Sequence, residues 1–329
     1  MTWLLGFAFL LWKIGLLLGF ILLVSAYLVL AERKLLGRMQ LRFGPNRAGP
    51  FGILQPVADG VKVLLKEDTV PDGADRILFL LAPSVFTLTA LLIFAVVPFG
   101  EPVTLWGYEI PMVIADLNVG LLYVLALSSI GVYGVVLGGW ASNSKYSLLG
   151  AIRGGAQMIS YELSLGLSLV PVVMLARSLS LVDIVRAQAE CPFILLQPVA
   201  FLVFLVSAMA ESKRIPFDLP EAENELLAGY HTEYSGMRFA LFFLGEYASM
   251  FALGALLAVF FLGGWYGPVL PPFVWLAIKA LLVPFFLFWT RGSLPRVRYD
   301  QLMHLCWKVL VPVALLNIVI TGGFMALAG

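Results

Sequence analysis

The stretch of the chain best equipped for chemistry is an acidic segment in its second half, residues 216–234. Its sequence is PFDLPEAENELLAGYHTEY, and it holds five carboxylates: Asp218, Glu221, Glu223, Glu225 and Glu233. Acidic capping of a helix N-terminus explains Asp218 and Glu221. It does not explain Glu225, because like charges one helical turn apart repel. Coupled carboxyls share protons among themselves, so the segment is predicted to load protons and to respond to a nearby change of charge.

Further carboxylates lie within or at the ends of long apolar stretches: Glu32, Glu162, Glu211 and Glu246. Glu162 and Glu246 fall inside predicted membrane spans, where an ionised group is costly unless it faces water or a partner. A functional role is therefore expected for these two. Glu32 and Glu211 mark predicted span ends, where an interfacial charge on its own is ordinary.

The sequence shows no redox or metal-binding pattern of its own. Its two cysteines, Cys191 and Cys306, are predicted to lie in loops on opposite membrane faces. That arrangement forms no iron–sulfur or zinc site, and no glycine-rich phosphate cradle or nucleophile–base pattern occurs. We expect no metal site and no catalytic residue, so that any redox chemistry belongs to a partner. The net charge of +1 gives no field that favours nucleic acid.

The elements that must position these groups are membrane helices. The chain is 61% hydrophobic and 12% charged, with a mean hydropathy of +0.96, which is not the composition of a water-facing surface. A span needs about 20 apolar residues, and its backbone groups must pair within the segment. We predict an all-α polytopic membrane protein, a single integral membrane domain over 1–329. Eight transmembrane helices are expected at 3–31, 77–98, 118–140, 157–176, 193–211, 239–262, 273–290 and 307–327.

The distribution of Lys and Arg predicts the orientation of these helices. Four loops hold 8, 2, 3 and 4 of these residues in chain order: 32–76, 141–156, 212–238 and 291–308. The loops on the other side hold only Arg177 and Arg186. Because positive charge accumulates in cytoplasmic loops, the four loops are expected in the cytoplasm and both termini outside it. The loop at 212–238, which contains the acidic segment, is called the acidic loop below.

The first of these loops contains a predicted amphipathic helix at about 50–66. Its polar residues recur at spacings of four, three and four: Gln55, Asp59, Lys62 and Lys66. Apolar residues fill the other face, and the segment is too short and too charged to span a membrane. It is expected to lie in the interface plane, either against other subunits or as a simple membrane-surface anchor.

The chain resembles one known family in three stretches. They are ERKLLGRMQLRFGPNRAGPFGILQPVADGVKVLLKED at 32–68, SKYSLLGAIRGGAQMISYELSLGLSL at 144–169 and RIPFDLPEAENELLAGYHTEYSGMRFALFFLGEY at 214–247. The family is the H subunit of the proton-pumping NADH:quinone oxidoreductase, respiratory complex I, whose mitochondrial counterpart is subunit 1. The resemblance covers nearly the whole chain. It implies a multi-pass subunit of this enzyme in the bacterial inner (plasma) membrane, with both termini on the periplasmic side.

The resemblance also implies a chamber for quinone. The family subunit encloses it together with two peripheral subunits, which carry the quinone-head site and the terminal iron–sulfur cluster. Quinone, either ubiquinone or menaquinone, would be the substrate, while FMN and the iron–sulfur clusters stay in partner subunits. Small and antiporter-like membrane subunits are further implied partners, besides the lipid bilayer. The residues implied to line or support the chamber are Glu32, Arg33, Arg42, Arg47, Asp59, Lys62, Phe217 and Arg291.

The same resemblance implies an acidic funnel that couples quinone reduction to proton translocation. We hypothesise that quinone reduction shifts the protonation of this funnel, and that Glu162 and Glu246 pass the change to the antiporter-like subunits. The matching positions are Glu162, Glu211, Asp218, Glu221, Glu223, Glu225, Glu233 and Glu246.

Two alternatives stand beside this interpretation. The homologous membrane subunit of an energy-converting hydrogenase shares the start of the first stretch and the amphipathic helix, but it needs no quinone chamber; the full loop at 216–236 favours the quinone enzyme. An independent proton-coupled secondary transporter also uses buried carboxylates and broken apolar segments. The interfacial helix and the large charged cytoplasmic surface favour docking to other subunits instead.

Overall fold

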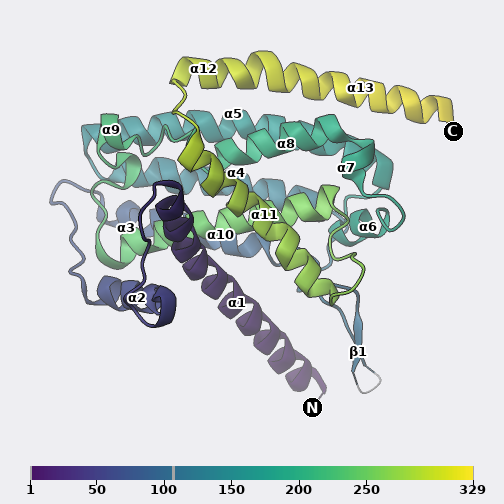
Figure 1. The fold of residues 1–329 in the computed structure, drawn as a ribbon, viewed down its shortest axis with the longest axis horizontal. Helices are drawn as coiled ribbons and strands as arrows, with labels where there is room; N and C mark the ends of the chain where they lie inside the picture. Colours follow the sequence, from purple (N-terminus) through teal and green to yellow (C-terminus); the bar gives the residue numbers. More distant parts are fainter. Residues whose placement is uncertain (1, 106–107, 329) are drawn as a thin grey trace.

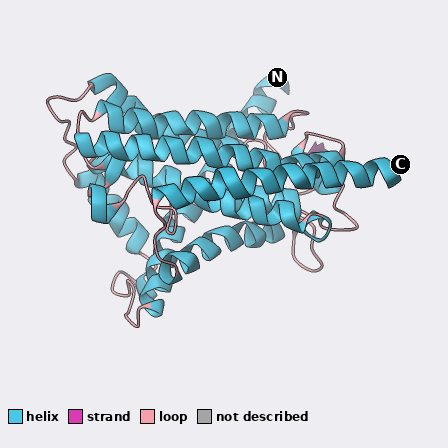
Figure 2. Cartoon of the chain, turned by 90° about the horizontal axis from the view of Figure 1, so that it is seen from above, coloured by secondary structure: helices cyan, strands magenta, loops and turns pink. Residues whose placement is uncertain are grey.

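Helices form almost the entire fold. The computed structural model describes residues 2–105 and 108–328, and the side chains of 6–104, 109–222 and 225–327. Helices run side by side through most of the molecule, and the only strands of the described residues form one small pair (Figure 2). Seven helices of this part of the chain are long and apolar enough to cross a membrane. The all-α polytopic membrane fold predicted from the sequence is confirmed.

Each of these seven helices contains a long apolar run, and some have clear end signals. The Asp75 side chain begins one of them by accepting hydrogen bonds from the backbone N–H groups of Ile77 and Leu78, at 3.1 and 3.2 Å. The seven are α1 (Thr2–Met39), α3 (Arg76–Ile93), α4 (Gly120–Ala141), α5 (Lys145–Ala176), α10 (Gly236–Phe261), α11 (Pro272–Ser293) and a continuous helix made of α12 (Tyr299–His304), the π-helical η3 (Leu305–Leu310) and α13 (Val311–Ala328).

The remaining predicted span, 193–211, is divided into two helices. α7 (Phe193–Leu196) and α8 (Pro198–Glu211) meet at Gln197, since Pro198 has no N–H to continue the hydrogen-bond ladder. α8 has 14 residues, which at about 1.5 Å per residue is shorter than the hydrocarbon core. The amide of Gln197 bonds Thr321 at 3.0 Å and Asn317 at 2.9 Å, so α13 satisfies the polar groups at the break.

The shorter elements lie at the two ends of the bundle. β1 and β2 pair antiparallel, with Val103 opposite Ile110. The predicted amphipathic segment contains a short 3₁₀ turn followed by α2, which buries none of its residues in this chain. Its apolar face is therefore free for lipid or for another subunit. The elements are η1 (Pro50–Gly52), α2 (Gln55–Leu65), β1 (Val103–Leu105), β2 (Tyr108–Ile110), α6 (Leu181–Arg186), α9 (Glu223–Leu226) and η2 (Gly229–His231).

α10 is the central helix of the bundle. In its most apolar stretch 83% of the residues are buried, against 22% for α1 and 17% for the C-terminal helix. Small residues let its neighbours approach closely: a side chain at Gly245 would meet Phe86 of α3 at 2.8 Å, and one at Gly254 would meet the Ala280 carbonyl of α11 at 1.9 Å. A polar side chain on α10 is thus surrounded by protein rather than by lipid.

Two lysines inside the predicted spans are structural hydrogen-bond donors. Lys279 of α11 donates to three carbonyls that follow or end α10, those of Leu262, Gly264 and Tyr266, at 2.6, 3.0 and 2.7 Å. Lys13 of α1 donates to the carbonyl of Val113 at 2.6 Å. The prediction that Cys306 lies in a loop is wrong. Cys306 is buried in the helical turn η3, because the last helix begins at Tyr299.

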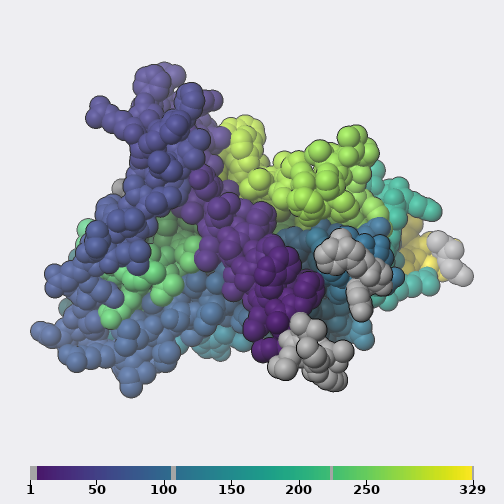
Figure 3. Space-filling view, turned by 90° about the horizontal axis from the view of Figure 1, so that it is seen from below, coloured from purple at the N-terminus to yellow at the C-terminus, as the bar shows by residue number. Residues whose placement is uncertain are grey.

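The two ends of the bundle differ in character. Both termini lie at the end that carries the β hairpin, α6 and α7, and the opposite end carries α2 and α9 (Figure 1). The four loops rich in Lys and Arg all belong to this opposite end. Figure 3 shows α1 in purple running obliquely across one face of the molecule, between the segment around α2 and the yellow-green α11.

Candidate functional site

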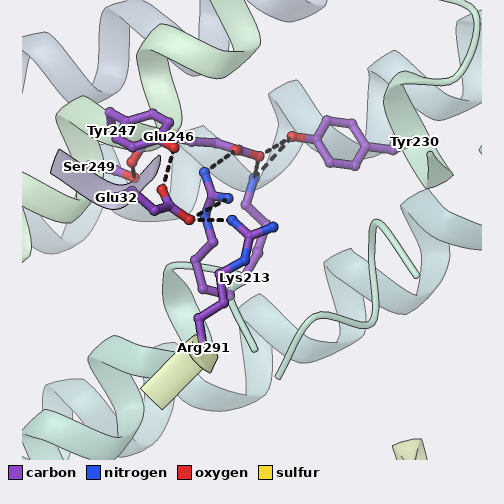
Figure 4. Close-up of polar contacts among 8 residues, drawn as sticks. Glu32, Lys213, Tyr230, Glu246, Tyr247, Ser249 and Arg291 are labelled. Carbon is purple, nitrogen blue, oxygen red and sulfur yellow. Dashed lines mark hydrogen bonds and ion pairs between the residues drawn. The ribbon is translucent and has the colours of Figure 1, made fainter. Parts of the chain in front are cut away.

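Two buried carboxylates from different helices meet near the end of the bundle that carries α2. Glu32 stands near the C-terminal end of α1 and Glu246 stands within α10, and they are only 3% and 4% exposed. The guanidinium of Arg214 bridges them: its Nη1 is 3.8 Å from Glu32 and its Nη2 is 3.3 Å from Glu246. Arg291 of α11 also pairs with Glu32. Figure 4 shows these side chains converging on one point.

Tyrosines and a lysine complete this cluster. The Tyr230 hydroxyl donates to Glu246 at 2.7 Å, and the Tyr247 hydroxyl donates to Glu32 (Figure 4). Lys213 lies 3.5 Å from Glu246 and donates to the Tyr230 hydroxyl at 3.3 Å. Buried charges are tolerated when each is paired and hydrogen-bonded, and the network meets that condition. We call Glu32, Lys213, Arg214, Tyr230, Glu246, Tyr247 and Arg291 the charge cluster.

The acidic loop adds two carboxyls to this cluster. The Glu221 carboxyl is hydrogen-bonded to Glu246, and burial together with the neighbouring Glu246 charge raises the pKa of Glu221 well above its usual range. Asp218 lies 3.7 Å from Arg296. Burial raises the pKa of Asp218 to about 6, against the lowering effect of Arg296 and two further arginines. The loop therefore holds a carboxyl that keeps its proton at neutral pH and another that titrates just below it.

The acidic loop is fixed against α5 by close backbone contacts. Gly229 has φ +58°, and a side chain there would meet the Pro220 carbonyl at 1.7 Å, so only glycine fits. A side chain at Gly150 of α5 would meet the same carbonyl at 2.7 Å. The buried amide of Gln157 donates to the carbonyls of Ala210 and Phe217 at 2.7 and 2.8 Å. These contacts place Tyr230, which follows Gly229, within reach of Glu246.

A cavity of about 290 Å³ opens beside the charge cluster. It brings together residues from both sets implied by the resemblance: Glu32, Arg33, Arg42 and Arg291 from the chamber set, and Glu221 and Glu246 from the proton-path set. Its other lining residues are Leu36, Arg214, Tyr230, His231, Phe239, Phe242, Phe243 and Tyr247. Its lining thus combines charged and aromatic side chains.

The other predicted chamber residues do not line this cavity. Asp59 of α2 pairs with Arg33 at 2.7 Å, which connects α2 to the cavity rim. Arg47 and Lys62 are exposed at the end of the molecule that carries α2. Phe217 is buried, with its ring 5.9 Å from that of Tyr161.

Two of the predicted proton-path residues form a second group deeper in the bundle. Ser128 and Ser129 of α4 donate to Glu211 of α8, at 3.4 Å, and to Glu162 of α5. The second oxygen of Glu211 is buried without a hydrogen-bond partner among the described residues. Beside it lies a smaller cavity of about 50 Å³, which is otherwise lined mostly by apolar side chains and Ser249.

The remaining predicted proton-path residues lie nearer the surface. The Glu225 side chain is 53% exposed and pairs with Arg153 at 2.7 Å, an interaction that lowers the pKa of Glu225. Glu233 is half-buried. Glu223 begins α9, but its side chain lies outside the described residues.

Sequence reasoning missed the basic and phenolic members of the charge cluster: Lys213, Arg214, Tyr230 and Tyr247. One signal was present for Tyr247, which follows Phe239 and Phe243 at intervals of four residues and therefore shares a face of α10 with them. No comparable signal exists for Tyr230, because its position depends on the fold of the loop. No group of three or more His, Cys, Asp or Glu side chains in the described part could hold a metal ion.

The fold and the site define a class: a multi-pass membrane protein with a buried charge cluster beside a cavity at one end of its helices. The family described as NADH dehydrogenase matches residues 12–322. The H subunit, second form, of the NADH-quinone oxidoreductase of Syntrophobacter fumaroxidans is 68% identical over 100% of this chain and 99% of its own length. The protein of the same name from Geobacter sulfurreducens is 67% identical over 94% of both chains, and the H subunit of Thermomicrobium roseum is 56% identical over 93% and 94%.

The chain belongs to the NADH dehydrogenase family, among the H subunits of NADH-quinone oxidoreductase. The resemblance found in the sequence is thereby confirmed. The chain is a membrane subunit of an enzyme complex and not a complete enzyme.

Proposed function

We propose that this subunit encloses part of the quinone chamber of NADH-quinone oxidoreductase and couples quinone reduction to proton translocation. The observation that carries the proposal is the cavity of about 290 Å³, which is lined by four of the predicted chamber residues and two of the predicted proton-path residues. Quinone is the substrate, as the names of the relatives state for those proteins. FMN and iron–sulfur clusters reside in partner subunits, which deliver the electrons.

The two kinds of lining residue suit the two parts of a quinone. Leu36, Phe239, Phe242 and Phe243 offer apolar surface to an isoprenoid tail, and the charged lining residues suit a polar head. When Glu221 holds its proton, the cations Lys213, Arg214, Arg291 and Arg296 face the carboxylates Glu32, Asp218 and Glu246. The cluster then carries an excess positive charge, which attracts the negative charge of a reduced quinone.

Quinone reduction consumes protons and places negative charge near the cluster. That charge raises the proton affinity of nearby carboxyls, so reduction and protonation are coupled in free energy. Glu246 takes up this proton first, because it lines the cavity and the neighbouring Glu221 already holds a proton. Glu211 and Glu162, with Ser128 and Ser129, continue the path toward the neighbouring membrane subunits.

The surface around α2 is the proposed contact with the peripheral subunits. Leu41, Phe43 and Phe51 in the segment before α2 are 97%, 92% and 81% exposed. Large apolar side chains so exposed beside Arg47 and Lys62 fit an interface with another subunit better than free solvent. Glu225 is exposed and Glu233 is half-buried, and both would collect protons from the cytoplasm. Both termini are then periplasmic.

The Glu246→Gln variant of the assembled complex tests the proposal. Protons pumped per NADH oxidised are measured in proteoliposomes, and the amount of complex is normalised by NADH oxidation with an artificial acceptor. We expect the ratio to fall to less than half, because a neutral amide cannot take up the proton. Glu190→Gln is the control, since it removes an exposed carboxylate of another loop. A normal ratio in Glu246→Gln would remove the cluster from the coupling mechanism.

A further inference from the structure

Lys213 is the only buried lysine among the described side chains, with an exposed fraction of 1%. A buried ammonium is costly unless it is paired, so its position requires an explanation. Its Nζ lies 3.5 Å from Glu246, 3.3 Å from the Tyr230 hydroxyl and 4.1 Å from the centre of the Phe86 ring. The ring face of Phe86 and the two oxygen partners together hold the charge in place.

These partners belong to two different cavities. Tyr230 and Glu246 line the larger cavity beside the charge cluster, whereas Phe86 lines the smaller cavity beside Glu211. The Lys213 ammonium therefore stands in the partition between the two cavities. It is a polar group that contacts the wall of both.

The backbone of Lys213 is held in a conformation that directs the side chain inward. Its φ is +54°, in the left-handed region that residues other than glycine rarely adopt. The Lys213 N–H donates to the Ala210 carbonyl at 3.2 Å, which closes the turn after α8. This turn places the lysine two residues beyond Glu211 in the chain, and the two side chains interact electrostatically.

Lys213 is thus shared between two carboxylates that it does not bind equally. It forms an ion pair with Glu246 in this structure, and Arg214 gives Glu246 a second cation. Glu211 has no ion pair within the described residues; its nearest charges are Lys213 and Glu162, and one of its oxygens has no hydrogen-bond partner there. Glu211 is consequently the carboxylate that would gain most from a closer ammonium.

We propose that Lys213 is a positioning residue that switches between Glu246 and Glu211 and so links the two cavities. When Glu246 takes up a proton, its attraction for the ammonium is lost, and Lys213 turns to Glu211. Glu211, which holds its proton while Lys213 pairs with Glu246, then releases that proton through Ser128 toward Glu162. Glu246 gains one proton and Glu211 releases one, while the Lys213 ammonium keeps its three protons. This inference rests on the proposed proton-coupling function.

Several other groups face this switch and influence its titration. α3 contributes the Phe86 ring to the surroundings of Lys213. The titratable and charged groups around Lys213 and its two carboxylates are Glu162 from α5, Arg214, Asp218 and Glu221 from the acidic loop, and Tyr230 and His231 from η2. The switch is therefore expected to respond to pH as part of the whole cluster.

The test compares Lys213→Met with Lys213→Arg in the assembled complex, using protons pumped per NADH between pH 6 and pH 9. We expect Lys213→Met to lower the ratio at pH 7 at least threefold. The pH of half-maximal pumping should also rise by about one pH unit, because carboxyls that lose a nearby cation hold their protons to higher pH. Lys213→Arg keeps the charge and should recover most of the ratio and the original pH profile.

A purely structural lysine would give a different result. It would lower the yield of complex while leaving the ratio and the pH profile of the remaining complex unchanged, and that outcome overturns the inference. If Lys213→Met fails to assemble, the Lys213→Met and Glu246→Gln double variant is compared with Glu246→Gln alone, since it leaves no unpaired ammonium. A pH of half-maximal pumping higher than that of Glu246→Gln supports the switch, because Glu211 has then lost the ammonium, and an unchanged pH profile contradicts it.

The result also separates this inference from the proposed function. Normal pumping in Lys213→Met, together with impaired pumping in Glu246→Gln, rejects the switch alone. Normal pumping in Glu246→Gln rejects the proposed function and the switch with it.

Discussion

Arg214 holds the two central carboxylates of the site together. Its forked guanidinium reaches Glu32 on α1 and Glu246 on α10 at the same time, and it lies 5.0 Å from the Tyr247 ring. A lysine has one charged atom and could not make this double contact. Burial of the ion pairs gives little net stability, but removing a single partner would leave an unpaired charge at a cost of about 3–5 kcal/mol. Each charged member of the cluster therefore depends on its partners for its stability.

Asp218 gives a prediction at the scale of one residue. Burial raises its pKa to about 6 in the folded protein, so its carboxyl is protonated below pH 6 and ionised above it. Because the folded pKa is raised, the protonated carboxyl favours folding, and this contribution is lost as the pH rises through 6. Infrared spectra of the complex and of Asp218→Asn should differ by a protonated-carboxyl band at pH 5 that disappears by pH 8. Absence of this band at pH 5 would show that Arg296 keeps Asp218 ionised.

The acidic residues of the site could be predicted from the sequence, and their partners could not. Glu246 stands out because it lies inside a predicted span, whereas Glu32 and Glu221 were assigned to the site through the family resemblance. Lys213 and Arg214 resemble ordinary cationic residues at a span end, where positive charge is expected in any case. Only the left-handed turn at Lys213 directs its ammonium inward, and nothing in the local sequence predicts that turn.

At the scale of elements, the loop between α8 and α10 decides whether the cluster forms. Gly229→Ala should displace this loop, since its methyl group would meet the Pro220 carbonyl at 1.7 Å at a φ of +58°. Tyr230 would then lose Glu246. We expect at least a fivefold loss of assembled complex or of protons pumped per NADH.

Gly166→Ala is the matched control for this loop variant. It lies in α5, as the glycines facing the loop do, but its nearest neighbour is a Leu125 methyl group at 3.9 Å. Assembly and pumping should stay normal in Gly166→Ala. Normal values in Gly229→Ala as well would mean that the loop tolerates the shift and does not position Tyr230.

The helices themselves were predictable, but their ends and one break were not. Apolar runs located seven long helices, yet α5 begins at Lys145 and the last helix at Tyr299, each before the apolar run starts. Charged residues continue a helix beyond the hydrocarbon, where hydropathy gives no signal. The break at Gln197 was missed because the pairing of its amide with α13 involves residues more than a hundred positions away.

At the scale of the whole molecule, the two ends of the helix bundle carry different features. The charge cluster, the larger cavity and the exposed segment before α2 lie toward one end, and the termini and hairpin lie at the other (Figure 1). This polarity suits a subunit that receives quinone and partners at one membrane face.

The most direct test of this account is a cryo-EM map of the assembled complex with a quinone or a quinone-site inhibitor bound. The account predicts ligand density reaching the cavity between Arg42 and Tyr247, with ordered water joining Glu221 and Glu246 to Glu211. A cavity filled by a partner's side chains, or sealed from the bound ligand by protein, would contradict it.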